Sequence, residues 1–140
     1  MNLVVADASL VIKWLLPDRL AEADTELALA LFERVERGDV SLCQPDHWLA
    51  EVGAVLARLS PQTAERQIAA LWDMEIPVVS GAEISATAVR LAIQLRHHLF
   101  DTLYHAVALA VPGATLVTAD EIYYRKSRSL GRIQRLADVA

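Results

Sequence analysis

The sequence predicts a single α/β domain over residues 1–140, with a central, mostly parallel, twisted sheet flanked by helices on both faces. Short apolar runs of strand length alternate with longer segments in which apolar residues recur at helical spacing. The strands are too far apart along the chain to form hairpins, so neighbouring strands are expected to be parallel. With 54% hydrophobic and 22% charged residues, the composition is that of a globular chain with one core.

The first half of the chain is expected to contain two strands and four helices. Ser9 can cap a short helix that Pro17 stops, and Gly38 ends the second helix. Pro61 can open the fourth helix, because the first helical position needs no N–H. The strands are expected over residues 3–6 and 40–43, and the helices over 9–16, 21–37, 45–59 and 61–73.

The second half continues the alternation of strands and helices. Pro112 and Gly113 end a helix and lead directly into an apolar run, and a short polar helix separates that run from a final edge strand. The strands are expected over residues 76–79, 115–118 and 133–136, and the helices over 83–98, 101–111 and 121–128.

Two carboxylates follow strands directly, and two more lie on helices. Asp7 and Asp120 close apolar strands, and ligands of open α/β sheets bind at the carboxyl ends of strands. Glu51 lies beside the apolar stripe of its helix, where a lone carboxylate is unfavourable unless a metal or an arginine such as Arg58 pairs with it. Asp101 begins a later helix. The pattern indicates a carboxylate cage for hard divalent cations.

Three of these acids also have a purely structural explanation. Asp7 and Asp120 could each cap the helix that follows, and Asp101 could be the N-cap of its own helix with Phe100 as the hydrophobic residue before it.

Four segments make the chain resemble PIN-domain proteins and, within that family, the VapC-type toxins. They are VVADASLVIKWLLPD, PDHWLAEVGAVL, FDTLYHAVALA and LVTADE, which occur in this order between residues 3 and 121. The resemblance implies a PIN-like fold and a metal-dependent endoribonuclease that leaves 5′-phosphate and 3′-hydroxyl ends. It also implies four acidic metal-site residues, which are matched here by Asp7, Glu51, Asp101 and Asp120. One or two Mg²⁺ or Mn²⁺ ions suit such oxygen ligands.

The resemblance assigns supporting roles to further residues. Ser9 and Thr118 match hydroxyl residues that would orient the carboxylates or their waters. The chain departs from the family pattern at Ala54, where many members have Asn, and at His105, where an apolar residue is usual. We expect His105 to act as a proton donor behind the ligands.

Histidines near the acids raise zinc or manganese as the runner-up metal. His47 precedes Glu51 by four residues, and His97, Asp101 and His105 follow one another at the same spacing, so their side chains could share a helix face. Because helix-surface histidines are common, we expect oxygen rather than imidazole ligation.

The net charge of −5 at first argues against a nucleic-acid partner. Without the four candidate ligands, however, 14 acids stand against 13 bases, and bound cations would reverse the local sign. Arg125, Lys126 and Arg128 are candidates for RNA contact near Tyr123 and Tyr124. The same segment could instead be a solvated face or dock an acidic partner.

The remaining features concern partners and location. The lone Cys43, the absence of a signal-peptide pattern and the absence of a long apolar run lead us to expect a cytoplasmic protein with no membrane contact. Apolar residues around Trp14 and Trp72 could form a homodimer interface or a groove for a partner helix, or could simply pack in the core. For a VapC-type protein, the resemblance implies a cognate antitoxin.

These observations lead to one expected function and several alternatives. We expect the toxin ribonuclease of a type II toxin–antitoxin pair, acting on RNA and forming a homodimer. A catalytically inactive PIN-fold binding module is the main alternative. A haloacid-dehalogenase-like phosphatase would have an acid at Ser9, and a receiver domain would have a lysine after its final strand.

Overall fold

The sheet places two buried apolar strands at its centre. The computed structural model describes residues 2–17 and 24–139. Its main sheet has the order β2-β1-β5-β6, and every neighbouring pair is parallel. A second, two-stranded parallel sheet pairs β3 with β4. The strands are β1 (Leu3–Ala6), β2 (Ser41–Leu42), β3 (Gln44–Pro45), β4 (Val78–Val79), β5 (Ala114–Thr118) and β6 (Ile133–Arg135).

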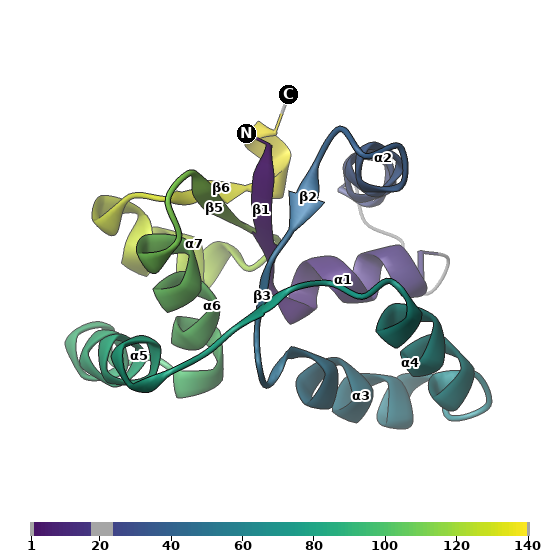
Figure 1. The fold of residues 1–140 in the computed structure, drawn as a ribbon, viewed down its shortest axis with the longest axis horizontal. Coiled ribbons are helices and arrows are strands. Elements are labelled where there is room, and N and C mark those ends of the chain that lie inside the picture. The colour runs from purple at the N-terminus through teal and green to yellow at the C-terminus, as the bar shows by residue number, and fades with distance from the viewer. Residues whose placement is uncertain (1, 18–23, 140) are drawn as a thin grey trace.

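Helices cover both faces of the main sheet. Figure 1 shows α6 and α7 on one side of β1 and α1 and α2 on the other, with α3 and α4 packed as a pair below α1. The helices are α1 (Ala8–Leu15), α2 (Thr25–Glu36), α3 (Trp48–Leu59), α4 (Ala64–Asp73), α5 (Ala82–Leu95), α6 (Leu99–Ala110) and α7 (Glu121–Ser127), with short 3₁₀ turns η1 (Arg128–Leu130) and η2 (Leu136–Asp138). This arrangement confirms the single α/β domain with a parallel sheet.

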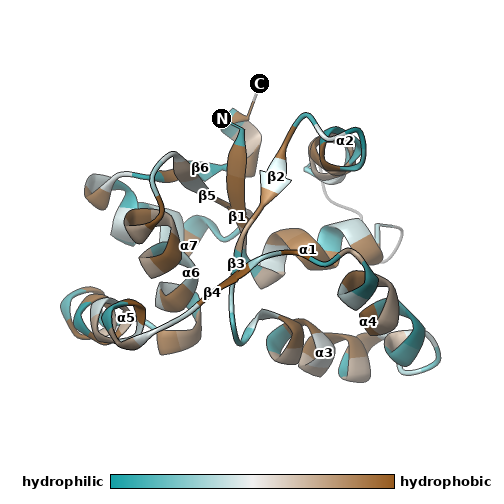
Figure 2. Ribbon diagram, in the orientation of Figure 1, coloured by the Kyte–Doolittle hydropathy of each residue, from teal (hydrophilic) through white to brown (hydrophobic). Residues whose placement is uncertain are grey.

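The core forms where β1 and β5 meet the helices. Val4, Val5 and Ala6 of β1 and Leu116 and Val117 of β5 are fully buried, and β1 is drawn in the hydrophobic colour in Figure 2. A strand buried on both faces reads as a continuous apolar run rather than an alternating one, and β1, with the sequence LVVA, has this form.

Buried Gln44 fixes the end of β1. Its side-chain amide donates to the carbonyl of Ala6 at 2.7 Å, and its oxygen accepts the N–H of Ala6 at 2.8 Å. Both backbone polar groups of Ala6 are therefore satisfied by one side chain, as a buried site requires. The backbone position at which the chain leaves the sheet and continues into Asp7 is therefore fixed.

Several element boundaries differ from the expectations. The cap of α1 is Asp7 rather than Ser9. Residues 61–63 form a turn, so α4 begins at Ala64 and Pro61 precedes it. The helix expected over 101–111 begins at Leu99 with His98 as its N-cap, so Asp101 lies in the first turn and is not a cap. The expected start of the helix over 21–37 lies outside the described residues.

Within the described residues, no helix combines the length and hydrophobicity that crossing a lipid bilayer requires.

Candidate metal centre

Asp7 is buried at the junction of β1 and α1. Its Oδ1 accepts the hydroxyl of Ser9 at 2.6 Å and the backbone N–H of Leu10 at 3.1 Å, so this oxygen caps the helix. Only 8% of Asp7 is exposed. Burial raises its pKa from 3.8 to about 6, and the charge of Asp101 adds to the rise, while the hydrogen bonds oppose it. The carboxylate is thus under electrostatic strain that a cation would relieve.

Asp120 takes the equivalent place after β5. Its Oδ1 accepts the N–H of Tyr123 and caps α7, while its own N–H donates to Oγ1 of Thr118 at 2.9 Å. The hydroxyl of Ser9 also accepts the N–H of Ala119 at 3.1 Å. Ser9 therefore ties the Asp7 turn to the Asp120 turn. The helix-capping explanation is correct for both acids, but the capping bonds use only Oδ1 of each.

Asp101 and Asp120 meet at the surface together with His97. The ring Nε2 of His97 lies 2.7 Å from Oδ2 of Asp101. His97, Asp101 and Asp120 each present a ligand atom, and these three atoms lie within 4.8 Å of one another. The predicted proximity of His97 and Asp101 is confirmed, but the predicted shared helix face is wrong, because His97 lies in the turn between α5 and α6.

Glu51 points its carboxylate toward α6. Its Oε1 accepts the hydroxyl of Tyr104 at 2.8 Å, whereas Arg58 is exposed and makes no described contact with it. Burial raises the pKa of Tyr104, and the neighbouring charges of Glu51, Asp7 and Asp101 raise it further. Tyr104 is therefore a neutral donor surrounded by three of the four acids.

Together these contacts bring the four predicted acids into one region without placing all of them in one tight group. The three-residue group that could hold an ion contains Asp101 and Asp120 but not Asp7 or Glu51, which adjoin it through Asp101 and Tyr104. None of the four acids is paired with an arginine among the described ion pairs. Carboxylate oxygens of this kind fit a hard divalent cation.

His105 lies deeper than expected. Its Nε2 donates to the carbonyl of Gly131 at 2.8 Å, and its Nδ1 therefore accepts the hydroxyl of Tyr123 at 2.9 Å. Burial lowers its pKa, so the ring is neutral. His105 makes no described hydrogen bond to an acid. It reaches the site only through Tyr123, whose ring packs edge-on against His97.

His47 packs beside the site without bonding to an acid. Its Nε2 donates to the carbonyl of Phe100 at 2.9 Å, and its ring packs against Phe100 and Tyr104. Burial lowers its pKa. These contacts hold the N-terminus of α3 against α6.

The basic residues after Asp120 divide into two groups. Arg132 donates to carbonyls of residues 111 and 114, and Arg135 pairs with Asp138 and Glu121, so both stabilise the fold. Arg125, Lys126 and Arg128 are exposed. Of these three, Lys126 contacts the site directly, because its Nζ lies 3.2 Å from Nδ1 of His97.

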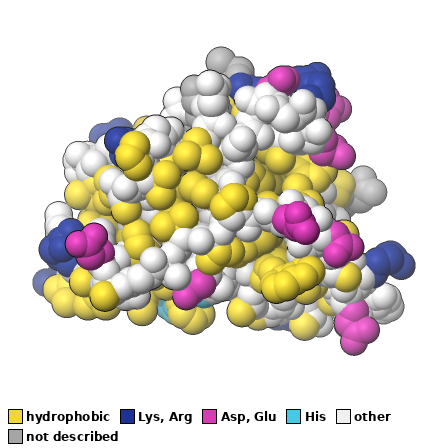
Figure 3. Space-filling model, viewed as in Figure 1, with side chains coloured by type: hydrophobic (Ala, Val, Ile, Leu, Met, Phe, Trp, Pro, Cys, Tyr) yellow, Lys and Arg dark blue, Asp and Glu magenta, His cyan; other side chains and the backbone are white. Residues whose placement is uncertain are grey.

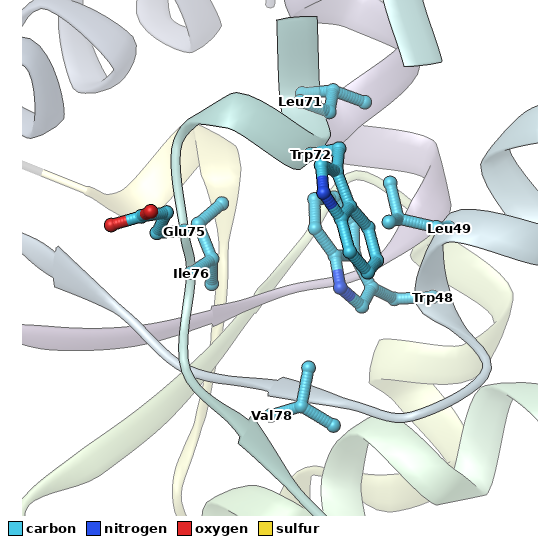
Figure 4. Close-up of a pocket in the computed structure, with 7 residues that line it drawn as sticks. All are labelled: Trp48, Leu49, Leu71, Trp72, Glu75, Ile76 and Val78. Atoms are coloured by element: carbon cyan, nitrogen blue, oxygen red, sulfur yellow. The ribbon is translucent and has the colours of Figure 1, made fainter. Parts of the chain in front are cut away.

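Of the two tryptophans considered for a partner surface, one is buried in the core and the other is exposed. Trp14 is buried and packs on Phe32, so it belongs to the core. Trp72 is 71% exposed and borders a cavity of about 360 Å³ (Figure 4). Figure 3 shows hydrophobic side chains spread across the face of the molecule that is viewed in Figure 1. The cavity is lined by Trp48, Leu49, Leu71, Trp72, Glu75, Ile76 and Val78.

Comparison with known proteins gives one result. A profile of the PIN domain family matches residues 4–129, a span that includes all four predicted acids. No curated protein sequence matches the chain. The match confirms the PIN-domain resemblance, and the VapC-type assignment within the family stays a prediction.

Proposed function

Because the chain belongs to the PIN domain family, whose members are generally nucleases, we propose that it is a metal-dependent endoribonuclease. The observation that supports the proposal is that Asp101 and Asp120 meet beside His97, while Asp7 and Glu51 lie close enough for their charges, like that of Asp101, to act on Tyr104. Its catalytic, metal-binding residues would be Asp7, Glu51, Asp101 and Asp120. One or two Mg²⁺ or Mn²⁺ ions would supply a more acidic water and neutralise charge on the phosphate.

The protein's own contribution is to hold these carboxylates still. In Asp7 and Asp120, one carboxylate oxygen accepts a backbone N–H of the following helix. This bond fixes the orientation of the carboxylate and therefore of its second oxygen. Ser9 and Thr118 lock the two turns to each other and to β5. Tyr104 orients Glu51 across the gap between α6 and α3. Preorganisation of this kind lowers the barrier because no rearrangement is needed during the reaction.

His105 contributes from behind these residues. Since both its ring nitrogens are engaged away from the acids, it would position Tyr123 rather than transfer a proton to RNA. Arg125, Lys126 and Arg128 would contact the phosphates of the RNA, because they are exposed cations on α7, the helix that Asp120 caps, and at the start of η1 directly after it.

Cleavage of labelled single-stranded RNA tests the proposal. Wild-type protein should cleave with Mg²⁺ or Mn²⁺ and stop when EDTA is added. Asp101→Asn and Asp7→Asn should each lower the rate at least a hundredfold, because each removes a ligand charge but keeps the shape. Glu36→Gln, an exposed acid on α2, is the matched control. Wild-type rates in either site variant would refute the assignment, and metal binding without any cleavage would favour the binding module.

We also propose that the protein is the toxin of a type II toxin–antitoxin pair and forms a homodimer. The VapC-like segments support the first point. The cavity beside Trp72 supports a partner segment that is apolar and carries a basic residue to face Glu75. Co-expression with the product of a neighbouring short reading frame should inhibit cleavage, and Trp72→Asp should abolish that inhibition. Light scattering of the isolated protein tests the dimer.

A further inference from the structure

We propose that His97 is a positioning residue that holds the ammonium of Lys126 beside the carboxylates as the phosphate contact of the site. The proposal rests on the ribonuclease function proposed above and deepens it. His97 lies close enough to Asp101 and Asp120 to be a metal ligand as well as a positioning residue. The hydrogen bonds of its ring decide between the two roles.

The first step is which of the two ring nitrogens of His97 carries the hydrogen. The ammonium of Lys126 can only donate hydrogen bonds, so Nδ1 of His97, 3.2 Å away, must carry its lone pair. Nε2 then carries the proton and donates it to Oδ2 of Asp101 at 2.7 Å. Both nitrogens are thus engaged in a chain from Lys126 through His97 to Asp101. His97 has no lone pair left for a metal ion in this arrangement.

The second step is how firmly Lys126 is held. Its Nζ also donates to the carbonyl of Arg96 at 3.1 Å. The ring of His97 is itself fixed, since it packs edge-on against Tyr123, with centroids 4.8 Å apart, and its side chain is only 12% exposed. Lys126 lies three residues after Tyr123, so both lie on one face of α7.

The third step is what the ammonium can still bind. A lysine has three N–H donors, and the carbonyl of Arg96 and His97 account for two of them. The third is free to meet a phosphate oxygen without breaking the other two bonds. Within residues 2–17 and 24–139, no such anchor is described for Arg125 or Arg128: Arg125 bonds to the carbonyl of Glu121 on its own helix, and Arg128 is exposed in η1.

A double-mutant cycle on RNA cleavage tests the proposal. Lys126→Met should lower kcat/KM about tenfold and make its dependence on salt less steep by about 0.7 in log–log slope, the loss of one phosphate contact. His97→Phe keeps the ring against Tyr123 but removes the nitrogen that holds Lys126, so it should produce the same two changes. The double variant should be no worse than either single variant. Arg66→Met, an exposed cation on α4, is the control for the loss of charge alone.

Metal affinity, measured by calorimetry with Mn²⁺ and with Mg²⁺, separates the two roles of His97. A positioning residue should leave the ratio of the two affinities unchanged in His97→Phe. A ligand should lower the affinity for Mn²⁺ more than that for Mg²⁺, because imidazole suits Mn²⁺ better. That result, or additive effects of the two variants on cleavage, would overturn the proposal. If the wild-type protein bound metal but cleaved no RNA, the ribonuclease function itself would fail instead.

Discussion

At Asp7, the stability of the fold and the proposed chemistry have opposite requirements. Metal binding needs the ionised carboxylate, whereas burial makes that ionised form unfavourable in the metal-free protein. Its folded pKa of about 6 lies above the unfolded value of 3.8. The folded state therefore holds the proton more tightly, and stability present below pH 4 is lost as the pH rises through 6. The difference corresponds to about 3 kcal/mol in the metal-free protein above pH 7.

Asp7→Asn should remove this pH dependence. Asparagine carries no charge but still caps a helix well, so α1 stays capped. In EDTA at pH 8 the variant should unfold with a free energy up to about 3 kcal/mol larger than the wild type, and at pH 4 the two should be nearly equal. Urea denaturation at both pH values measures this. An advantage that is the same at both would show that the carboxyl group is not strained.

Tyr104 should be needed to orient Glu51. Tyr104→Phe removes the hydroxyl that donates to Oε1 of Glu51 but keeps the buried ring. The free energy of unfolding should fall by about 1 kcal/mol, and the RNA cleavage rate should fall about tenfold or more, as is typical when a group that orients a metal ligand is lost. Tyr124→Phe, whose ring lies under Arg135, is the matched control. Equal rates for both variants would show that Glu51 needs no such donor.

The acids were predictable as single residues, whereas their partners were not. Asp7 and Asp120 stand directly after apolar strands, so the chain itself places them at one sheet edge. The donor of Glu51 comes from Tyr104, which lies 53 residues away and reaches it only after α3 and α6 pack. His105 has the same spacing from Asp101 as His97, but packing turns it to Tyr123 and Gly131. The spacing of residues along a helix predicts which of them share a helix face. Which residues that face contacts is decided only when the elements pack.

At the scale of elements, α5 ends in a strained residue. Arg96, its C-cap, has φ of 50°, in the left-handed region that glycine adopts without strain. Arg96→Gly should therefore raise the free energy of unfolding by about 0.5–1 kcal/mol. Arg90→Gly, at an exposed position inside the same helix, should lower it by about 1 kcal/mol. Denaturant melts of both variants check the opposite signs, and a loss in both would show that Arg96 makes contacts that outweigh its backbone strain.

The boundaries that sequence reasoning missed have local causes. Periodicity located the helix that became α4, but the hydroxyls of Ser60 and Thr63 bond to each other at 2.6 Å and hold a turn, so Pro61 stays outside the helix. Arg96 could not be recognised as a helix end, because the usual signal there is glycine or asparagine. The strands expected over 40–43 and 76–79 are present as β2 and β4, but each is only two residues long. The separate two-residue strand β3 was not expected, because so short a strand has no recognisable pattern.

At the scale of the whole molecule, the proposed centre joins both faces of the sheet. Its acids come from the end of β1, from α3, from α6 and from the end of β5, so a bound ion would connect segments more than a hundred residues apart. Binding that occurs only in the folded state stabilises the entire fold.

Metal should therefore raise the melting temperature of the whole domain. At one hundred times its dissociation constant, Mn²⁺ should add about 2.7 kcal/mol, or about 5–10 °C in melting temperature for a chain of this size. Asp101→Asn should lose this gain even if relief of repulsion makes its metal-free form more stable, and Glu36→Gln should keep it. Thermal melts with Mn²⁺ and with EDTA measure the difference. A gain of equal size in Asp101→Asn would place the ion elsewhere, because a site that includes Asp101 must bind more weakly once that carboxylate is gone.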